Sequence, residues 1–175
     1  MRFARAETGS SVGNTEERGD METIKESIET NVPVSSAYNQ WTQFEEFPKF
    51  MEGVESVTQI DDTHLRWVAE VGGQRREWQA EIVEQVPDER ITWRATDGNG
   101  PNGLVTFEPL GEDSTLITVE MSYEPEGLKE QLGAKIGFDS RQVKEDLNRF
   151  KQLVETMGTE TGAWRGEVHA GVRRS

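Results

Sequence analysis

The feature that most constrains this chain is a series of six strand-like segments followed by one amphipathic helix. The six segments lie between Val54 and Tyr123, and in them apolar and polar residues alternate with a period of two. The helix lies between Val143 and Met157, where apolar residues recur at intervals of three and four. One apolar sheet face needs a cover, and this helix can supply it. We therefore predict an α+β domain in which a curved antiparallel sheet encloses the helix and an apolar ligand cavity.

A two-residue turn at Gly72 and Gly73 sets the register of one hairpin. Because this dipeptide is a common hairpin signal, the flanking strands can be aligned residue by residue. The predicted pairs are Trp67 with Trp78, Leu65 with Ala80, and Ala69 with Arg76. Since alternate residues of a strand point to the same side, one face of the hairpin carries two tryptophans.

The segment ahead of the six strands adds one strand and helical turns. Residues Thr23 to Val32 alternate as a first strand, and Pro33 suits the first turn of a helix. Val34 to Phe50 has an aromatic helical face, which Pro48 is expected to split into two short helices. The predicted order is one strand, two short helices, six strands and one long helix, with about seven strands in the sheet. Leu128 to Phe138 is predicted to be a short helix or a lid loop.

Both ends of the chain differ in composition from its centre. Residues 1–21 are rich in Gly, Ser, Thr and charge, and are predicted to be a disordered leader, with Met21 as an alternative start. Residues 22–158 are predicted to form the domain. Residues 159–175 are predicted to be a flexible tail on which Trp164 docks.

The charge balance argues against two classes of partner. The 175 residues include 33 Asp and Glu against 19 Lys and Arg, a formal net charge of -14. Such a field repels phosphate backbones and anionic lipid headgroups, so we expect no nucleic-acid partner and no stable membrane insertion. There is no apolar signal segment and no run of ~20 apolar residues, so the predicted location is cytoplasmic. The oligomeric state is not indicated.

No metal or cofactor site is predicted. The chain has no cysteine, and its two histidines, His64 and His169, lack metal-ligand spacing. The glycines within residues 98–103 spell G-x-G-x-x-G, but Pro101 and a strand stand where a dinucleotide-binding motif needs the start of a helix. This segment is interpreted as a flexible connection between strands.

Several segments together resemble a known superfamily. The chain is similar to START-like, Bet v 1-like proteins, in particular the bacterial polyketide cyclase/dehydrase (SRPBCC) proteins, and nearest to the coenzyme-Q-binding START-domain type. The likeness covers roughly residues 23–157 and implies a helix-grip fold with a hydrophobic ligand tunnel, but no catalytic motif that can be transferred. The segments that carry it are I-E-T-N-V-P-V-S-S-A-Y-N-Q-W from Ile28, F-E-E-F-P-K-F-M-E-G-V-E-S-V from Phe44, E-W-Q-A-E-I and V-P-D-E-R-I-T-W within Glu77 to Trp93, G-L-V-T-F-E-P-L from Gly103, and D-L-N-R-F-K-Q-L-V-E from Asp146.

The inward-facing aromatic side chains are the candidate ligand contacts. Flat rings suit a flat or greasy ligand, although pattern alone does not separate a packed core face from a cavity lining. The candidate ligand-binding residues are Trp67, Arg76, Trp78, Trp93, Phe107, Met121, Tyr123, Leu132, Phe138, Leu147 and Phe150.

Functions of different classes fit these residues. The first is non-enzymatic binding or transport of a hydrophobic small molecule, such as a lipid, a quinone or a polyketide-like compound. The second is a cyclase or dehydrase, which needs a positioned acid or base; Tyr123, Arg76 and Glu84 are the candidates. A third is an interaction protein whose cavity is vestigial. The aromatic face and the lack of a nucleophile–base set favour the first, so no catalytic residue is predicted.

Overall fold

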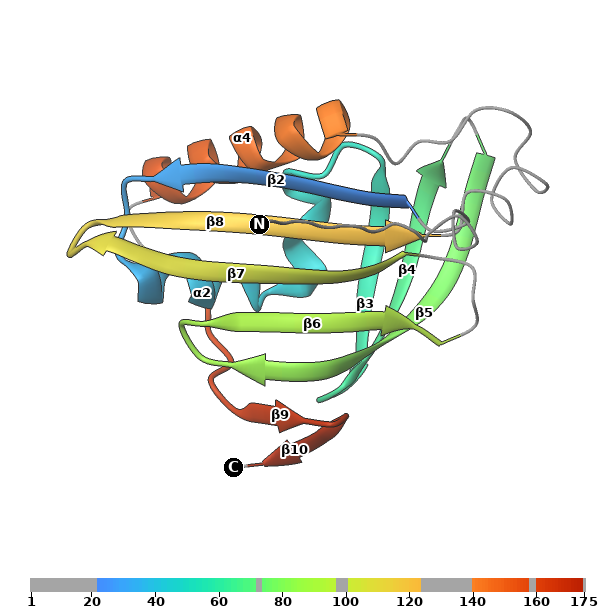
Figure 1. Ribbon diagram of the computed structural model, residues 1–175. Coiled ribbons are helices and arrows are strands. Elements are labelled where there is room, and N and C mark those ends of the chain that lie inside the picture. Colours follow the sequence, from blue (N-terminus) through green and yellow to red (C-terminus); the bar gives the residue numbers. More distant parts are fainter. Residues whose placement is uncertain (1–21, 72–73, 97–100, 124–139, 158–159, 175) are drawn as a thin grey trace, which may run out of the picture.

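The computed structural model describes residues 22–71, 74–96, 101–123, 140–157 and 160–174. Nine antiparallel strands form one curved, unclosed sheet that surrounds helix α2 and is bordered by helix α4 (Figure 1), which confirms the predicted α+β helix-grip architecture. In chain order the elements are β2 (Glu22–Thr30), α2 (Val34–Trp41), the 3-10 helix η1 (Phe44–Lys49), β3 (Val54–Asp61), β4 (His64–Val71), β5 (Gln74–Val86), β6 (Arg90–Ala95), β7 (Asn102–Gly111), β8 (Ser114–Tyr123), α4 (Ser140–Met157), β9 (Glu167–His169) and β10 (Val172–Arg174).

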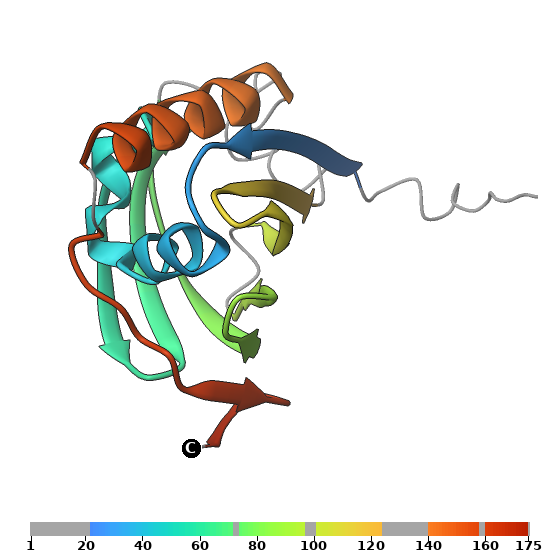
Figure 2. The ribbon, with the colours of Figure 1, turned by 90° about the vertical axis from the view of Figure 1, so that its left-hand side faces the viewer.

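The sheet bends at its longest strand, β5. Its first part pairs with β4 over Gln74–Glu81, and its second part pairs with β6 over Ala80–Val86. Seven strands thus follow the order β3-β4-β5-β6-β7-β8-β2, with a register shift between Ile82 and Glu84 where β5 crosses from one half to the other. Such a bulge increases local twist and bending. As a result the sheet curls, and α4 lies over its open side along β2 (Figures 1 and 2).

The register predicted for the β4–β5 hairpin is confirmed. Trp67 faces Trp78, Leu65 faces Ala80, and Ala69 faces Arg76. The two indole rings lie 5.8 Å apart with an angle of 7° between their planes, so they stack. Gly72 and Gly73 themselves lie outside the described residues.

Rows of inward side chains cross the sheet from strand to strand. One row runs from Ile28 of β2 through Ile117 of β8 to Phe107 of β7, and all three side chains are buried. This row lies under α2, whose Tyr38 ring is 5.4 Å from that of Phe107 in an edge-to-face contact. Trp41 follows Tyr38 in α2 and packs edge-to-face on Phe150 of α4, with ring centres 4.9 Å apart. The core therefore sits between α2, α4 and this end of the sheet.

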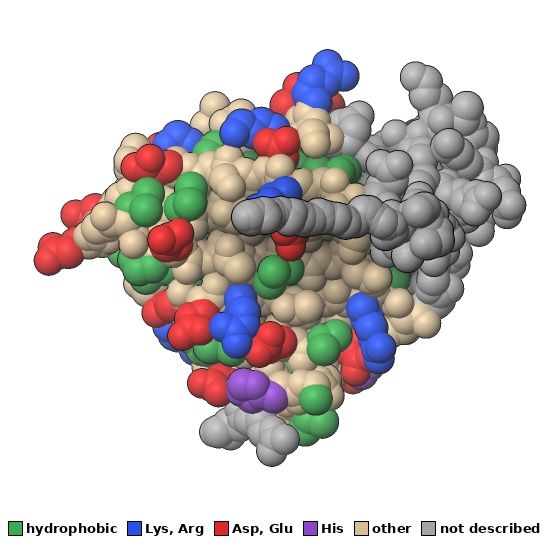
Figure 3. Space-filling view, in the orientation of Figure 1, with side chains coloured by type: hydrophobic (Ala, Val, Ile, Leu, Met, Phe, Trp, Pro, Cys, Tyr) green, Lys and Arg blue, Asp and Glu red, His purple; other side chains and the backbone are tan. Residues whose placement is uncertain are grey.

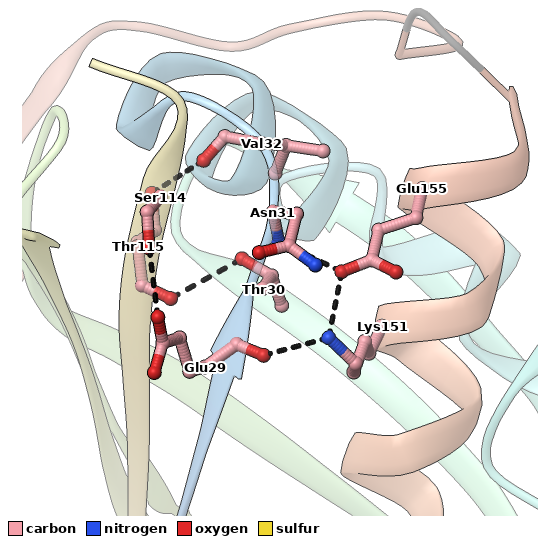
Figure 4. A network of polar contacts seen from close by, with 8 residues as sticks. All are labelled: Glu29, Thr30, Asn31, Val32, Ser114, Thr115, Lys151 and Glu155. Carbon is pink, nitrogen blue, oxygen red and sulfur yellow. Dashed lines mark hydrogen bonds and ion pairs between the residues drawn. The ribbon is translucent and has the colours of Figure 1, made fainter. Parts of the chain in front are cut away.

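Helix α4 is fastened to the edge strand β2 by polar contacts at its C-terminal half (Figure 4). Lys151 donates to the backbone carbonyl of Glu29 over 3.0 Å and pairs with the Glu155 carboxylate at 2.7 Å. The same carboxylate accepts the backbone N–H of Asn31 at 2.7 Å. These contacts hold the helix in place where it covers the core.

Two details of the predicted helices need correction. The chain breaks at Thr42, where α2 ends, and not at Pro48, which lies inside η1. The Thr42 hydroxyl donates to the carbonyl of Asn39 at 2.6 Å, which competes with continuation of the helix. Proline is tolerated in η1 because a short 3-10 helix makes few backbone hydrogen bonds.

Part of the predicted flexible tail, residues 159–175, has regular structure within the described range 160–174. β9 and β10 form a hairpin there, and Val168 of β9 pairs with Gln85 on the free edge of β5. Trp164, expected to dock, is partly buried, and its backbone N–H donates to the Thr42 hydroxyl at 3.0 Å. The segment from Glu160 to Arg165 thus packs along α2, and the hairpin that follows it joins β5.

Some predictions concern parts of the chain outside the described residues. These are the leader over 1–21 and the short helix or lid loop over Leu128 to Phe138. Within the described ranges, no helix combines the length and apolar character needed to cross a membrane. The outer face of β2, β8, β7 and β6, seen in Figure 3, carries interspersed acidic, basic and apolar side chains, the pattern of a solvated face.

Candidate ligand cavity

A cavity of about 110 Å³ lies between the concave face of the sheet, the α2–η1 segment and the N-terminal half of α4. It is smaller than the roughly 300–1,000 Å³ of most small-molecule pockets, but close to the ~150 Å³ of an engineered apolar cavity that takes up benzene. It has room for one ring or the end of a chain. Its lining is almost wholly apolar: Trp41, Phe44, Phe47, Phe50, Met51, Leu65, Trp67, Trp78, Ile82, Ile91, Trp93, Pro101, Val119, Met121, Val143 and Leu147, with Gln142 and Asp146 as the polar members.

The sheet contributes a second row of inward side chains to this lining. Ile82, Trp93, Gly103 and Met121 are cross-strand neighbours on β5 to β8. Gly103 makes room for the Trp93 indole, because a Cβ atom at that glycine would lie 2.1 Å from the ring. The missing side chain lets a large ring lie flat on the sheet at the cavity wall.

Helical turns supply the opposite wall with aromatic rings. Phe47 of η1 packs on Trp67 of β4, with ring centres 5.6 Å apart, and on Phe50, with ring centres 5.3 Å apart. Phe50 in turn contacts Trp41 at 5.8 Å. Because these rings pack on one another in edge-to-face and tilted contacts, each ring of the cavity wall is held in place by its neighbours.

Asp146 on α4 brings a carboxylate to the cavity wall. Its Oδ1 accepts hydrogen bonds from Gln142 Nε2 at 3.0 Å and from Arg149 Nη2 at 2.5 Å. Burial raises the pKa of this carboxyl above its ordinary value, while the hydrogen bonds from Arg149 and Gln142 oppose that rise. The position is therefore polar and partly desolvated.

Trp67, a lining residue from β4, carries a polar atom for which the described residues offer no partner. Its indole N–H is buried and has no hydrogen-bond partner within the part of the chain that the structure describes. A buried N–H without an acceptor costs roughly 1–3 kcal/mol. A guest that offers an acceptor oxygen could recover part of that free energy.

The structure brings several of the predicted site residues together and separates others. Those at the cavity are Trp67, Trp78, Trp93, Met121 and Leu147. Phe107 and Phe150 are buried in the packed core and are not among the residues that line the cavity. Arg76 follows the predicted inward register opposite Ala69, but it too is absent from the lining.

Of the remaining candidates, three have side chains that the structure does not describe, and the fourth, Glu84, is engaged in an ion pair. Leu132 and Phe138 lie outside them, and of Tyr123 only the backbone position in β8, opposite Glu22, is described. Glu84, a candidate acid or base, pairs with Arg90 at 2.8 Å, and that contact lowers the pKa of the Glu84 carboxyl. It does not line the cavity.

Gln142 and Asp146 are the polar positions that the sequence did not single out. They lie four residues apart, on the border of the apolar stripe that contains Val143 and Leu147. Their spacing could have marked them as polar residues next to the apolar stripe, but the many other charged residues of the helix do not let the sequence single them out. Among the described residues, no group of three His, Asp or Glu side chains is placed to hold a metal ion.

Comparison with known proteins places these observations in context. Residues 30–152 match the family described as polyketide cyclase/dehydrase and lipid transport. A Streptomyces lincolnensis protein of 17.2 kDa, described as uncharacterized, is 50% identical over 149 residues, which cover 85% of this chain and 99% of that protein. Among solved structures, a START superfamily protein from Mycobacterium smegmatis has 16% identity and a TM-score of 0.63, covering 77% of this chain and 98% of its own. The Zhui aromatase/cyclase from a Streptomyces species has 14% identity and a TM-score of 0.63, covering 82% and 99%. At these identities the two structures share the fold alone.

Proposed function

The chain belongs to the polyketide cyclase/dehydrase and lipid transport family, and from that premise we propose that it binds a hydrophobic small molecule in the cavity beside α4. The observation that carries the proposal is the aromatic, almost wholly apolar lining of a space about 110 Å³ in volume. Burial of apolar surface contributes about 25 cal/mol per Å², so a ring or chain end gains affinity there without polar contacts. The family includes both carriers and cyclases by its description, and binding is common to both.

A cyclase or dehydrase is the second candidate, and Asp146 is the observation in its favour. Such an enzyme needs a positioned acid or base near the substrate, and a carboxyl with a raised pKa at a cavity wall is suited to that role. Against it, this carboxyl is already held by Arg149 and Gln142, and the lining offers no Ser, Cys, His or Lys within the described ranges. We therefore place binding first. An Asp146→Asn variant that loses turnover of an aromatic polyketide substrate would reverse that order.

The test of binding is to fill the cavity from within. Val143 lines the space from α4, and a Val143→Phe substitution adds a ring of about the size of the guest that such a cavity admits. Isothermal titration calorimetry with ethylbenzene should show binding to the wild-type protein and at least ~10-fold weaker binding to the variant. Native mass spectrometry of the freshly purified protein should show a co-purified apolar compound that the variant lacks.

Leu153→Phe is the matched control. It adds the same ring to the same helix at a partly buried position outside the cavity, so its affinity for ethylbenzene should stay within about 2-fold of the wild-type value. A wild-type protein that takes up no ethylbenzene, or a Val143→Phe protein that binds it as well as the wild type, would refute the proposed function.

A further inference from the structure

The lining of the cavity carries a single charged side chain, and that charge is negative. Within the described residues, Asp146 is the sole charged member, and neither Lys, Arg nor His reaches the space. Its side chain is 18% exposed, so water screens it only in part. A ligand carboxylate placed in this cavity would therefore approach a like charge, and none of the described lining residues is a cation that could pair with it.

Arg149 is the cation that is bonded to Asp146, and two of its nitrogens are engaged. Its Nε donates to the backbone carbonyl of Phe50 at 2.9 Å, and its Nη2 donates to Asp146 at 2.5 Å. The same Nη2 lies 3.7 Å from the carboxylate of Glu52. One guanidinium thus stands beside two carboxylates, so the local balance stays negative, as does the net charge of the whole chain, -14.

Trp67 adds a requirement of a different kind. It lines the same cavity, and its buried indole N–H has no acceptor among the described residues. Its ring is held on one side by the stacked Trp78 ring, 5.8 Å away, and on another by Phe47, 5.6 Å away. Because the ring is fixed in this way, it cannot easily turn to find another partner, and its N–H stays without an acceptor unless a guest supplies one.

We propose that the cavity selects an uncharged ligand group, a ring or chain end that bears one hydrogen-bond acceptor such as a ketone, quinone or ether oxygen, and excludes carboxylate anions. The apolar wall favours the ring or chain, Trp67 favours the acceptor, and Asp146 opposes the anion. This inference rests on the proposed function and narrows it to a class of ligand. It separates neutral lipids and neutral polyketide-like compounds from free fatty acids and other organic acids.

Three single-ring probes of nearly equal shape test the inference on the wild-type protein. Ethylbenzene has no acceptor, acetophenone has a neutral carbonyl, and benzoate has the same ring with a carboxylate. At about pH 8, where benzoate is ionised, calorimetric titration should rank acetophenone first, ethylbenzene at least ~3-fold weaker, and benzoate at least ~10-fold weaker. If no probe binds, the proposed function fails; if benzoate binds as well as acetophenone, only this inference fails.

Any apolar cavity disfavours an ion, because the ion loses its hydration there. Two near-isosteric variants test whether Asp146 and Trp67 contribute to selectivity beyond this general effect. Asp146→Asn removes the negative charge but keeps the shape, so the ratio of benzoate to acetophenone dissociation constants should fall by at least ~5-fold. Trp67→Phe keeps a ring without the N–H, so the advantage of acetophenone over ethylbenzene should disappear. Thermal unfolding verifies that each variant is folded.

Each variant also has a result that would contradict the proposed selectivity. An Asp146→Asn protein that discriminates against benzoate as strongly as the wild type would show that the carboxylate takes no part in selection. A Trp67→Phe protein that still prefers acetophenone would show that the indole N–H does not receive the ligand oxygen.

Discussion

Replacement of Leu147 by alanine should convert this cavity into a larger one at a predictable cost in stability. Leu147 is 2% exposed, projects from the middle of α4 and lines the cavity. The substitution removes three carbon groups, worth ~0.8 kcal/mol each, or about 2.4 kcal/mol in transfer free energy. A further cost of ~24 cal/mol for each Å³ of new void adds to it. Because one side of Leu147 already faces the cavity, we expect a total near 3 kcal/mol, in the lower half of the ~2–5 kcal/mol range for such substitutions.

The same substitution should strengthen the response to an apolar ligand. The new void joins the existing space of about 110 Å³, so ethylbenzene fits with less displacement of side chains. A ligand that binds the folded state alone stabilises it by about 2.7 kcal/mol at 100 times its dissociation constant. Urea unfolding followed by circular dichroism, with and without saturating ethylbenzene, should therefore show a larger gain for the variant than for the wild type.

Val154→Ala is the matched control on the same helix. Val154 is also buried, at 6% exposure, but it lies two turns further along α4 and outside the lining. It should lose about 1.6 kcal/mol or somewhat more for its two carbon groups, with the same gain from ethylbenzene as the wild type. If ethylbenzene stabilised the two variants equally, or if Leu147→Ala lost no stability, the cavity would not lie beside Leu147.

Two more predictions concern the sheet and the core. Gly103→Ala places a Cβ 2.1 Å from the Trp93 ring, so it should lower the free energy of unfolding in urea by about 1–3 kcal/mol. Gly111→Ala is the control: nothing lies within 4 Å of its new Cβ, so the free energy of unfolding should change by less than about 0.5 kcal/mol. Burial raises the pKa of Tyr38 from 10.0 to about 12, against a hydrogen bond from Gln85. The folded state then holds this proton more tightly than the unfolded chain between those two values, so stability should fall as pH rises through that window, by about 2–3 kcal/mol in all. Tyr38→Phe should lack this component of the alkaline decline, and equal declines in the two proteins would contradict the assignment.

The register of the sheet could be predicted because local chemistry determines it. A two-residue turn leaves only one way to align its flanking strands, so Gly72 and Gly73 were enough to pair Trp67 with Trp78. The C-terminal hairpin had no such signal. β9 and β10 have three residues each, too few to show alternation, and β9 joins the sheet through the single pair of Val168 with Gln85.

The sequence could not predict whether an inward side chain belongs to the packed core or lines the cavity. Strand periodicity indicates which face of the sheet a side chain lies on, but not which helix covers that face. Phe107 and Trp93 both point inward from neighbouring strands. Phe107 meets the Tyr38 ring of α2 at 5.4 Å and belongs to the core. Trp93 lies further along the sheet, where it borders the cavity. Which helix reaches which row depends on the curvature of the sheet, and this arises from the whole set of strand pairings.

Among the described residues, the polar side chains of the cavity lining all come from α4. Side chains of the sheet that line the cavity are surrounded by neighbours on both adjacent strands, so a charge there would be largely desolvated. Arg76, which follows the inward register of β5, lies outside the lining. A helix residue on the border of the apolar stripe can reach the cavity and still keep a partner near the surface, as Asp146 does with Arg149, whose side chain is 35% exposed. A helix that closes a curved sheet can therefore add a charge to an otherwise apolar cavity at low cost in stability. For this reason we expect discrimination between charged and neutral ligands to be determined by α4, and affinity by the rings of the sheet and η1.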